Sequence, residues 1–210
     1  MAISTYTELQ AAVANWLHRS STSTGTNGEL MSAVIVDCIA LAEEQFNRRL
    51  RTRNQETALA STAINASYQV AIPANTVAVK QMWRVDGTEK LHLQSATLEF
   101  VSQRQSAGAT ARYYSMGASA WDFDGTGTVA GILYRTIPAL SGTSTNWLLT
   151  SHPSLYLYTA LSEAAQYTRD PDAVAMWAGK AEIALQHVQR SEQRAEFSGP
   201  IAVRANAYTP

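Results

Sequence analysis

Apolar residues at both ends of the chain recur at three- and four-residue steps, which predicts α-helices in these segments. Near the start, Thr5 and Glu8 have the spacing of a capping box and open a helix that ends near His18. Residues 20–28 are rich in Ser, Thr and Gly and favour a flexible loop. A longer helix follows and is marked by Leu30, Val34, Ile35, Cys38, Ile39, Ala42, Phe46 and Leu50.

The stretch from Ser154 to Tyr167 is apolar on most of its circumference if it forms a helix. Its polar residues make one stripe, which consists of Thr159, Ser162, Glu163 and Gln166. A helix of this kind is buried against several neighbours, and this one is too short to span a bilayer. We therefore expect it to pack on more than one side, against its own chain or against a neighbouring subunit.

A second C-terminal helix begins directly behind this stretch. Asp170 is the expected N-cap, and Pro171 occupies the first helical position, where proline is tolerated. The helix has a single apolar stripe, which consists of Val174, Trp177, Ala178, Ala181, Ala184, Leu185 and Val188. Because the link is so short, the two helices are expected to form an antiparallel hairpin.

In the middle of the chain the period changes to two, which predicts β-strands. Alternating runs surround Val70 and Val79 and recur in residues 112–116, 120–123 and 128–137. Asp86-Gly87 is a hairpin-turn pair, and Thr97 is placed to cap a short helix that ends at Gln105. Since short turns join these segments, an antiparallel sheet is expected.

The predicted fold class is therefore α+β. Residues 1–54 and 141–196 form a helical bundle, residues 55–140 form an inserted antiparallel β-rich region, and residues 197–210 form an extended C-terminal tail. Such a tail is often a frayed end, but it can also be an arm that orders on a partner.

Composition excludes several classes of function. Of the 210 residues, 46% are hydrophobic and only 16% are charged, which indicates a folded protein with a sparse layer of surface charge. A net charge of −1 provides no overall attraction to nucleic acid or to an acidic membrane. Cys38 is the only cysteine, so no intrachain disulfide is possible. The first residues lack the features of a secretory signal, and synthesis in the cytoplasm is expected.

A small cationic cluster follows the long N-terminal helix and consists of Arg48, Arg49, Arg51 and Arg53. Cations at a helix C-terminus interact favourably with the backbone dipole, which is the simpler interpretation. Contact with an acidic partner or with passing DNA is the alternative.

The only enzyme-like motif is Asp122-Phe123-Asp124-Gly125-Thr126, whose letters match the DxDGT loop of haloacid-dehalogenase-like phosphatases. The residues before it do not form an apolar strand, and too few residues follow it to build a doubly wound sheet. The stretch instead favours a β-hairpin turn.

No other pattern supports catalysis. The four histidines, His18, His92, His152 and His187, lack metal-ligand spacing, and no dinucleotide or phosphate-binding loop is found. We therefore predict no catalytic, cofactor-binding or metal-binding residue, and no cofactor.

Three stretches carry a resemblance to a known family: TYTELQAAVANWLHR at 5–19, IALAEEQFNRRLRTRNQE at 39–56, and YRTIPALSGTSTNWLLTSHPSLYLYTALSEAAQY at 134–167. In these stretches the chain resembles the head-to-tail adaptor proteins of tailed phages and related gene transfer agents. A fainter likeness continues to RAEFSG at 194–199.

The resemblance implies a structural protein of the phage neck that is made in the host cytoplasm. Such adaptors form a ring, generally a dodecamer, and join the portal protein to a tail, nozzle or stopper protein. On this reading no membrane is involved, DNA is met only in transit, and the tail is a portal-binding arm. The arm residues are Phe197, Ile201, Val203, Arg204 and Tyr208. The alternatives are another tail or head-completion structural protein, or a DxDGT-type phosphatase.

Overall fold

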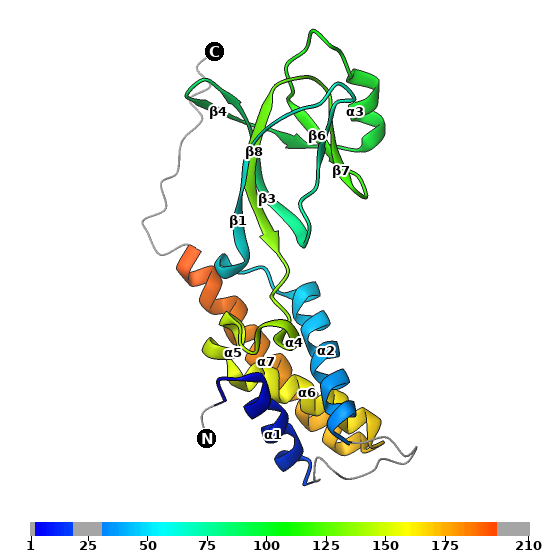
Figure 1. Ribbon diagram of the computed structural model, residues 1–210, viewed down its shortest axis with the longest axis vertical. Coiled ribbons are helices and arrows are strands. Elements are labelled where there is room, and N and C mark those ends of the chain that lie inside the picture. The colour runs from blue at the N-terminus through cyan, green and yellow to red at the C-terminus, as the bar shows by residue number, and fades with distance from the viewer. Residues whose placement is uncertain (1–2, 19–30, 197–210) are drawn as a thin grey trace, which may run out of the picture. The chain divides into compact units, whose positions relative to one another are not determined.

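The computed structural model describes residues 3–18 and 31–196, and the chain divides into two compact units. The helical unit comprises the chain up to Leu50 and again from Ile137 onward, and the β unit comprises Arg51–Thr136. Figure 1 shows helices in the first unit and mainly strands in the second. The predicted α+β class is therefore confirmed.

In its described residues, the helical unit contains two helices before the β unit and four after it. They are α1 (Tyr6–Trp16), α2 (Met31–Arg49), α4 (Leu140–Thr143), α5 (Trp147–Ser151), α6 (Pro153–Tyr167) and α7 (Pro171–Glu196). The short helices α4 and α5 were not predicted, because four or five residues are too few to display a helical period.

Two of the helix starts follow the predicted capping chemistry. The Thr5 hydroxyl accepts a hydrogen bond from the backbone N–H of Glu8 at 3.3 Å, and the Glu8 carboxylate accepts the backbone N–H of Thr5 at 3.0 Å. At the start of α7, the Asp170 carboxylate accepts the backbone N–H of Ala173 at 3.1 Å. Each cap satisfies an N–H group that has no partner within its helix.

The α6 helix packs against α1, α2, α5 and α7, as predicted for a helix that is apolar on most of its circumference. Its fully covered side chains include Tyr156, Ala160 and Leu161, and the Phe46 ring of α2 meets Tyr156 edge to face at 4.9 Å between centroids. The link Thr168–Asp170 turns the chain back so that α7 lies along α6.

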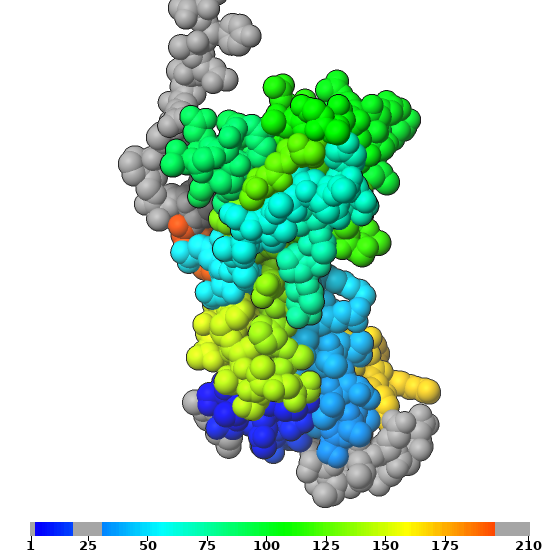
Figure 2. All heavy atoms as spheres, turned by 45° about the horizontal axis from the view of Figure 1, so that its top comes forward, coloured from blue at the N-terminus to red at the C-terminus, as the bar shows by residue number. Residues whose placement is uncertain are grey.

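The segment that re-enters the helical unit after the β unit is held by polar contacts with α2. The backbone N–H of Ile137 donates to the Asn47 side chain at 2.7 Å, and the N–H of Leu140 donates to the Glu43 carboxylate at 2.8 Å. The N–H of Tyr6 donates to the Ser144 carbonyl at 2.7 Å, and Figure 2 shows α1 in dark blue against the yellow-green α4–α5 segment. These bonds fix the segment that leads into α6.

The β unit contains the 3-10 helix Arg53–Gln55, the helix α3 (Leu98–Arg104) and two four-stranded sheets. One sheet has the order β1-β8-β3-β4, from β1 (Glu56–Ala63), β8 (Thr128–Arg135), β3 (Thr76–Asp86) and β4 (Glu89–His92). The other has the order β2-β7-β6-β5, from β2 (Gln69–Ala71), β7 (Ala120–Phe123), β6 (Tyr113–Met116) and β5 (Gln94–Ser95).

Two predictions for the β unit are corrected in part. Two sheets form where one was expected, and β5 pairs with β6 in parallel, although the other strand pairs are antiparallel. The predicted hairpin at Asp86-Gly87 is confirmed, since Asp86 pairs with Glu89 and Gly87 has a φ of 59°. The predicted cap of α3 is also confirmed, since the Thr97 hydroxyl accepts the backbone N–H of Phe100.

A register shift between Val79 and Gln81 in β3 changes which residues face the core. Beyond it, Met82 and Arg84 are buried, while Trp83 is half-buried. The buried Arg84 guanidinium donates to the Ala111 carbonyl at 3.2 Å. A shift of one residue exchanges the two faces of a strand, so the alternation alone could not identify the inward side.

Candidate interaction surfaces

The four arginines of the predicted cationic cluster do not act as one group. Arg48 forms an ion pair with Glu44, one turn earlier in α2, and Arg49 forms an ion pair with Glu182 of α7. Arg51 and Arg53 are exposed and belong to the β unit. Arg48 and Arg49 are thus each paired with a carboxylate of the chain itself.

A polar groove runs between α2 and α7, with α6 as its floor. It encloses about 240 Å³. Its floor is the polar stripe predicted for α6, which consists of Thr159, Ser162, Glu163 and Gln166. Within it, the Gln45 amide of α2 donates to the Glu163 carboxylate at 2.6 Å. The chain itself therefore covers much of this stripe: Thr159 and Ser162 are buried and Glu163 is half-buried, whereas Gln166 is exposed.

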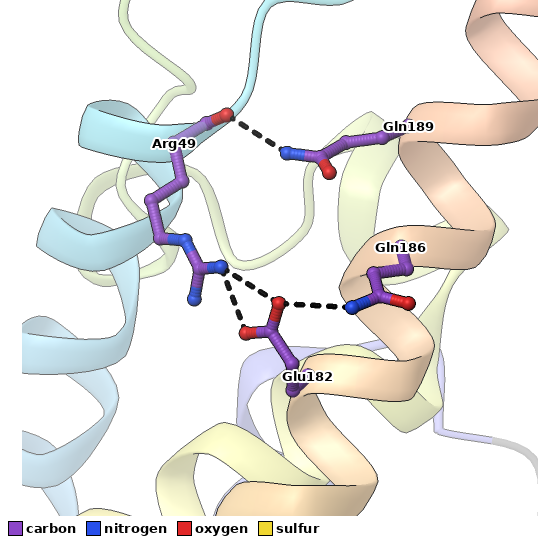
Figure 3. Close-up of polar contacts among 4 residues, drawn as sticks. All are labelled: Arg49, Glu182, Gln186 and Gln189. Carbon is purple, nitrogen blue, oxygen red and sulfur yellow. Dashed lines mark hydrogen bonds and ion pairs between the residues drawn. The ribbon is translucent and has the colours of Figure 1, made fainter.

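The groove is bridged by Arg49 and Glu182, as Figure 3 shows. The Arg49 guanidinium lies 2.7 Å from one Glu182 oxygen and donates to the other at 3.0 Å. Gln186 donates to the same carboxylate at 3.3 Å, and Gln189 donates to the Arg49 carbonyl at 3.3 Å. The hydrogen bond from Arg49 lowers the pKa of Glu182, so this carboxylate stays ionised at neutral pH.

An aromatic cluster joins α1, α6 and α7. The Trp177 ring stacks on Tyr158 at 5.9 Å between centroids and meets Trp16 edge to face at 5.4 Å. The Lys180 ammonium lies 4.5 Å from the centre of the Trp177 ring, within cation–π distance. Trp177 was predicted as a core residue and is buried, whereas Trp16 remains 47% exposed.

The outer face of α7 carries cations and uncovered apolar side chains. We define it by Met176, Lys180, Ile183, His187, Arg190 and Arg194, which follow one another at four- and three-residue steps and are all exposed. Ile183 is 59% exposed and Met176 is 48% exposed. A groove of about 390 Å³ adjoins this face between α7 and the start of α6. Sequence reasoning missed this surface, although Met176 and Ile183 lie outside the predicted apolar stripe.

The outer face of α2 carries two carboxylates, one of which is paired with a cation of the same face. We define it by Asp37, Leu41, Glu44 and Arg48, which follow one another at four- and three-residue steps and are all exposed. Leu41 is 47% exposed. Large apolar side chains on an exposed helix face, bordered by charges, are typical of a surface that contacts another protein.

A buried polar network lies on the opposite, inner side of α2. The Tyr156 hydroxyl accepts from the Asn146 amide at 2.7 Å and donates to the Glu43 carboxylate at 3.4 Å, which also accepts the N–H of Leu140. Burial raises the pKa of Glu43, although the hydrogen bonds from Leu140 and Tyr156 oppose this change. Burial likewise raises the pKa of Tyr156. The network links α2, the re-entering segment and α6.

The DxDGT stretch has structural roles in the β unit. The Asp122 carboxylate accepts the Gln69 amide at 2.8 Å, and the Asp124 carboxylate accepts the backbone N–H groups of Arg112 and Tyr113 at 2.8 and 2.9 Å. A Cβ on Gly125 would lie 2.5 Å from the Ala109 carbonyl oxygen, so only glycine fits there.

The hairpin predicted at this stretch is wrong. The strand before it, β7, pairs with β2 and β6, whereas the strand after it, β8, pairs with β1 and β3 of the other sheet. The stretch is therefore a crossing between two sheets. Because β7 pairs antiparallel with both of its neighbours, the parallel strand that supports a phosphatase loop is also missing here.

Within residues 3–18 and 31–196, no three His, Cys, Asp or Glu side chains gather as a metal ion would require. The described helices include none that is long and apolar enough to cross a membrane. Cys38 is buried, and burial raises the pKa of its thiol to about 12, so it is not a reactive cysteine. The predicted arm residues Phe197, Ile201, Val203, Arg204 and Tyr208 lie outside the described residues.

Comparison with known proteins places the chain among phage structural proteins. A family model described as SU10 adaptor protein matches residues 4–204 and so includes both units. No curated protein matches the sequence significantly.

Proposed function

Because the chain belongs to the SU10 adaptor protein family, a family of phage head-to-tail adaptors, we propose that it joins the portal to the tail in the phage neck. In this proposal the protein is a structural part of the virion without enzymatic activity. The family match carries the proposal, because it extends over residues 4–204, nearly the whole chain.

The geometry supports a protein that works through contacts with other proteins. Exposed apolar side chains on α2 and α7, such as Leu41 and Ile183, are bordered by charged residues. The acidic motif is engaged by its own backbone, since Asp124 accepts two main-chain N–H groups. In the described residues, exposed apolar surfaces thus favour protein binding, whereas the acidic motif favours a structural role over catalysis.

The proposed assembly is a ring of copies, generally twelve in this kind of adaptor, with a portal on one side and a tail, nozzle or stopper protein on the other. Residues 197–210 are proposed to bind the portal through Phe197, Ile201, Val203, Arg204 and Tyr208. DNA passes through such a ring without being a stable ligand. The proposed contacts for DNA or for an acidic partner are Arg48, Arg49, Arg51 and Arg53.

The test is to mix the purified protein with the portal protein of the same phage and to examine the product by electron microscopy and co-sedimentation. We expect a ring bound to the portal, formed equally well in the presence of a metal chelator and without nucleotide. Failure to bind the portal, or binding that requires a metal ion or nucleotide, would contradict the proposal.

A further inference from the structure

The outer faces of α2 and α7 complement each other in charge. Between Met176 and Arg194, the outer face of α7 presents Lys180, His187 and two arginines, and no carboxylate occupies its positions. The outer face of α2 presents the carboxylates of Asp37 and Glu44, with Arg48 paired to Glu44. Opposite charges on two surfaces favour their association and disfavour wrong pairings.

The two faces also match in spacing. On α2, Leu41 follows Asp37 by four residues and precedes Glu44 by three. On α7, read backwards, Ile183 follows His187 by four residues and precedes Lys180 by three. Both outer pairs are thus separated by two helical turns, roughly 10 Å. Laid antiparallel, the helices place Leu41 opposite Ile183. The Glu44 carboxylate then faces the Lys180 ammonium, and the Asp37 carboxylate faces the His187 imidazole.

We propose that the outer face of α2 on one copy of this chain packs antiparallel against the outer face of α7 on the next copy. This inference rests on the proposed ring and names the surfaces that would build it. Leu41 and Ile183 form the apolar centre of the contact, while Glu44 meets Lys180 and Asp37 meets His187.

A second copy fits these faces better than an unrelated partner, because both halves of the match are present in one chain. The contact joins two different patches. A pair of copies therefore still has a free α7 face on one copy and a free α2 face on the other. Repetition of such a contact produces a closed ring or an open filament, and not a two-fold dimer. The pairing of Glu44 with Arg48 does not prevent this, since an exposed ion pair on one helix exchanges partners at little cost.

Cysteine cross-linking in the full-length protein tests the contact directly. The variants Leu41→Cys and Ile183→Cys are prepared separately, mixed under mild oxidation and assayed both alone and with purified portal protein. We expect covalent dimers in the mixture at least ~10-fold faster than in either variant by itself, because association raises the effective thiol concentration. A chain that carries both substitutions should give a ladder of oligomers. Wild-type protein, with only the buried Cys38, is the blank.

The matched control is Ala178→Cys, an exposed position of α7 that lines the polar groove, paired with Leu41→Cys. Assembly is followed independently by native mass spectrometry. If oligomers form but Ile183→Cys cross-links no faster than Ala178→Cys, the proposed surface is wrong while the proposed ring is still supported. If no oligomer forms with or without portal, both are wrong. If duplex DNA protects Ile183→Cys from a thiol reagent while no cross-link forms, the outer face of α7 binds DNA instead.

Discussion

The Arg49 guanidinium and the Glu182 carboxylate lie 2.7 Å apart and join α2 to α7 across the polar groove. Both side chains are nearly half exposed, at 47% and 42%, so water screens much of their attraction. The pair therefore contributes little to the stability of the fold.

We expect a double-mutant cycle of Arg49→Ala and Glu182→Ala to give a coupling free energy of about 0.2–1 kcal/mol. Because the folded-state pKa of Glu182 is lowered, this stabilisation is present above the ordinary carboxyl pKa and is lost as the pH falls through the folded-state value. Chemical denaturation at neutral and acidic pH measures it. A coupling that persists in acid, or that does not weaken in high salt, would contradict this account.

The Leu161→Asp variant should lose several kcal/mol of unfolding free energy and yield little soluble protein. Leu161 is fully buried at the centre of the helical core, where an ionised carboxylate finds no partner. The control is Ala11→Asp, an exposed position on α1. Thermal melting compares the two, and a Leu161→Asp variant that melts like the wild type would show that α6 is not central.

The Glu43→Gln variant should be at least as stable as the wild type at neutral pH. Burial raises the folded-state pKa of Glu43, so the stability that this carboxyl contributes is present at low pH and is lost as the pH rises through that value. Glutamine keeps an oxygen that can accept from Leu140 and Tyr156 without the charge. The difference in unfolding free energy should therefore shrink toward zero as the pH falls to about 4.

Glu43→Ala provides the contrast for that experiment. It leaves the N–H of Leu140 without its side-chain acceptor and should lower the unfolding free energy by about 1–3 kcal/mol. If Glu43→Gln were as damaging as Glu43→Ala at neutral pH, the ionised form would be the one that the fold requires.

The Asp124→Ala variant should lower the unfolding free energy by about 1–3 kcal/mol, because the backbone N–H groups of Arg112 and Tyr113 lose their acceptor. Asp122→Asn should have a smaller effect, since an amide oxygen can still accept from Gln69. Denaturant titration measures both variants. Hydrolysis of an aryl phosphate by the wild type that Asp122→Asn abolishes would overturn the structural interpretation of this motif.

Ending the chain after Glu196 should leave the melting temperature nearly unchanged and weaken binding to the portal. The fourteen residues removed, 197–210, can reach about 45–50 Å when extended, and most of the binding anchors proposed here lie among them. Calorimetry and co-sedimentation with portal measure the two effects. Full portal binding, or a clear drop in melting temperature, would contradict the proposed arm.

Features whose partners are close in sequence could be predicted from the sequence alone. The capping box of Thr5 and Glu8, the Asp170 cap and the Asp86-Gly87 turn each involve residues within four positions of one another. The periodic apolar stripes likewise identified the long helices, because a buried face must repeat with the helical turn. The resemblance to phage adaptors also came from the sequence, and the family match confirmed it.

Features that depend on residues far apart were decided only by the tertiary structure. Arg49 and Glu182 are 133 positions apart, and no local pattern pairs them. The sequence after Asp124 is compatible with a hairpin, but β7 and β8 find partners in different sheets. Packing also decides the outer faces of α2 and α7. Neighbouring helices cover one side of each helix, and Leu41 and Ile183 stay exposed on the other side. Local chemistry specifies the elements of this protein, and long-range packing selects which of their surfaces remain open to a partner.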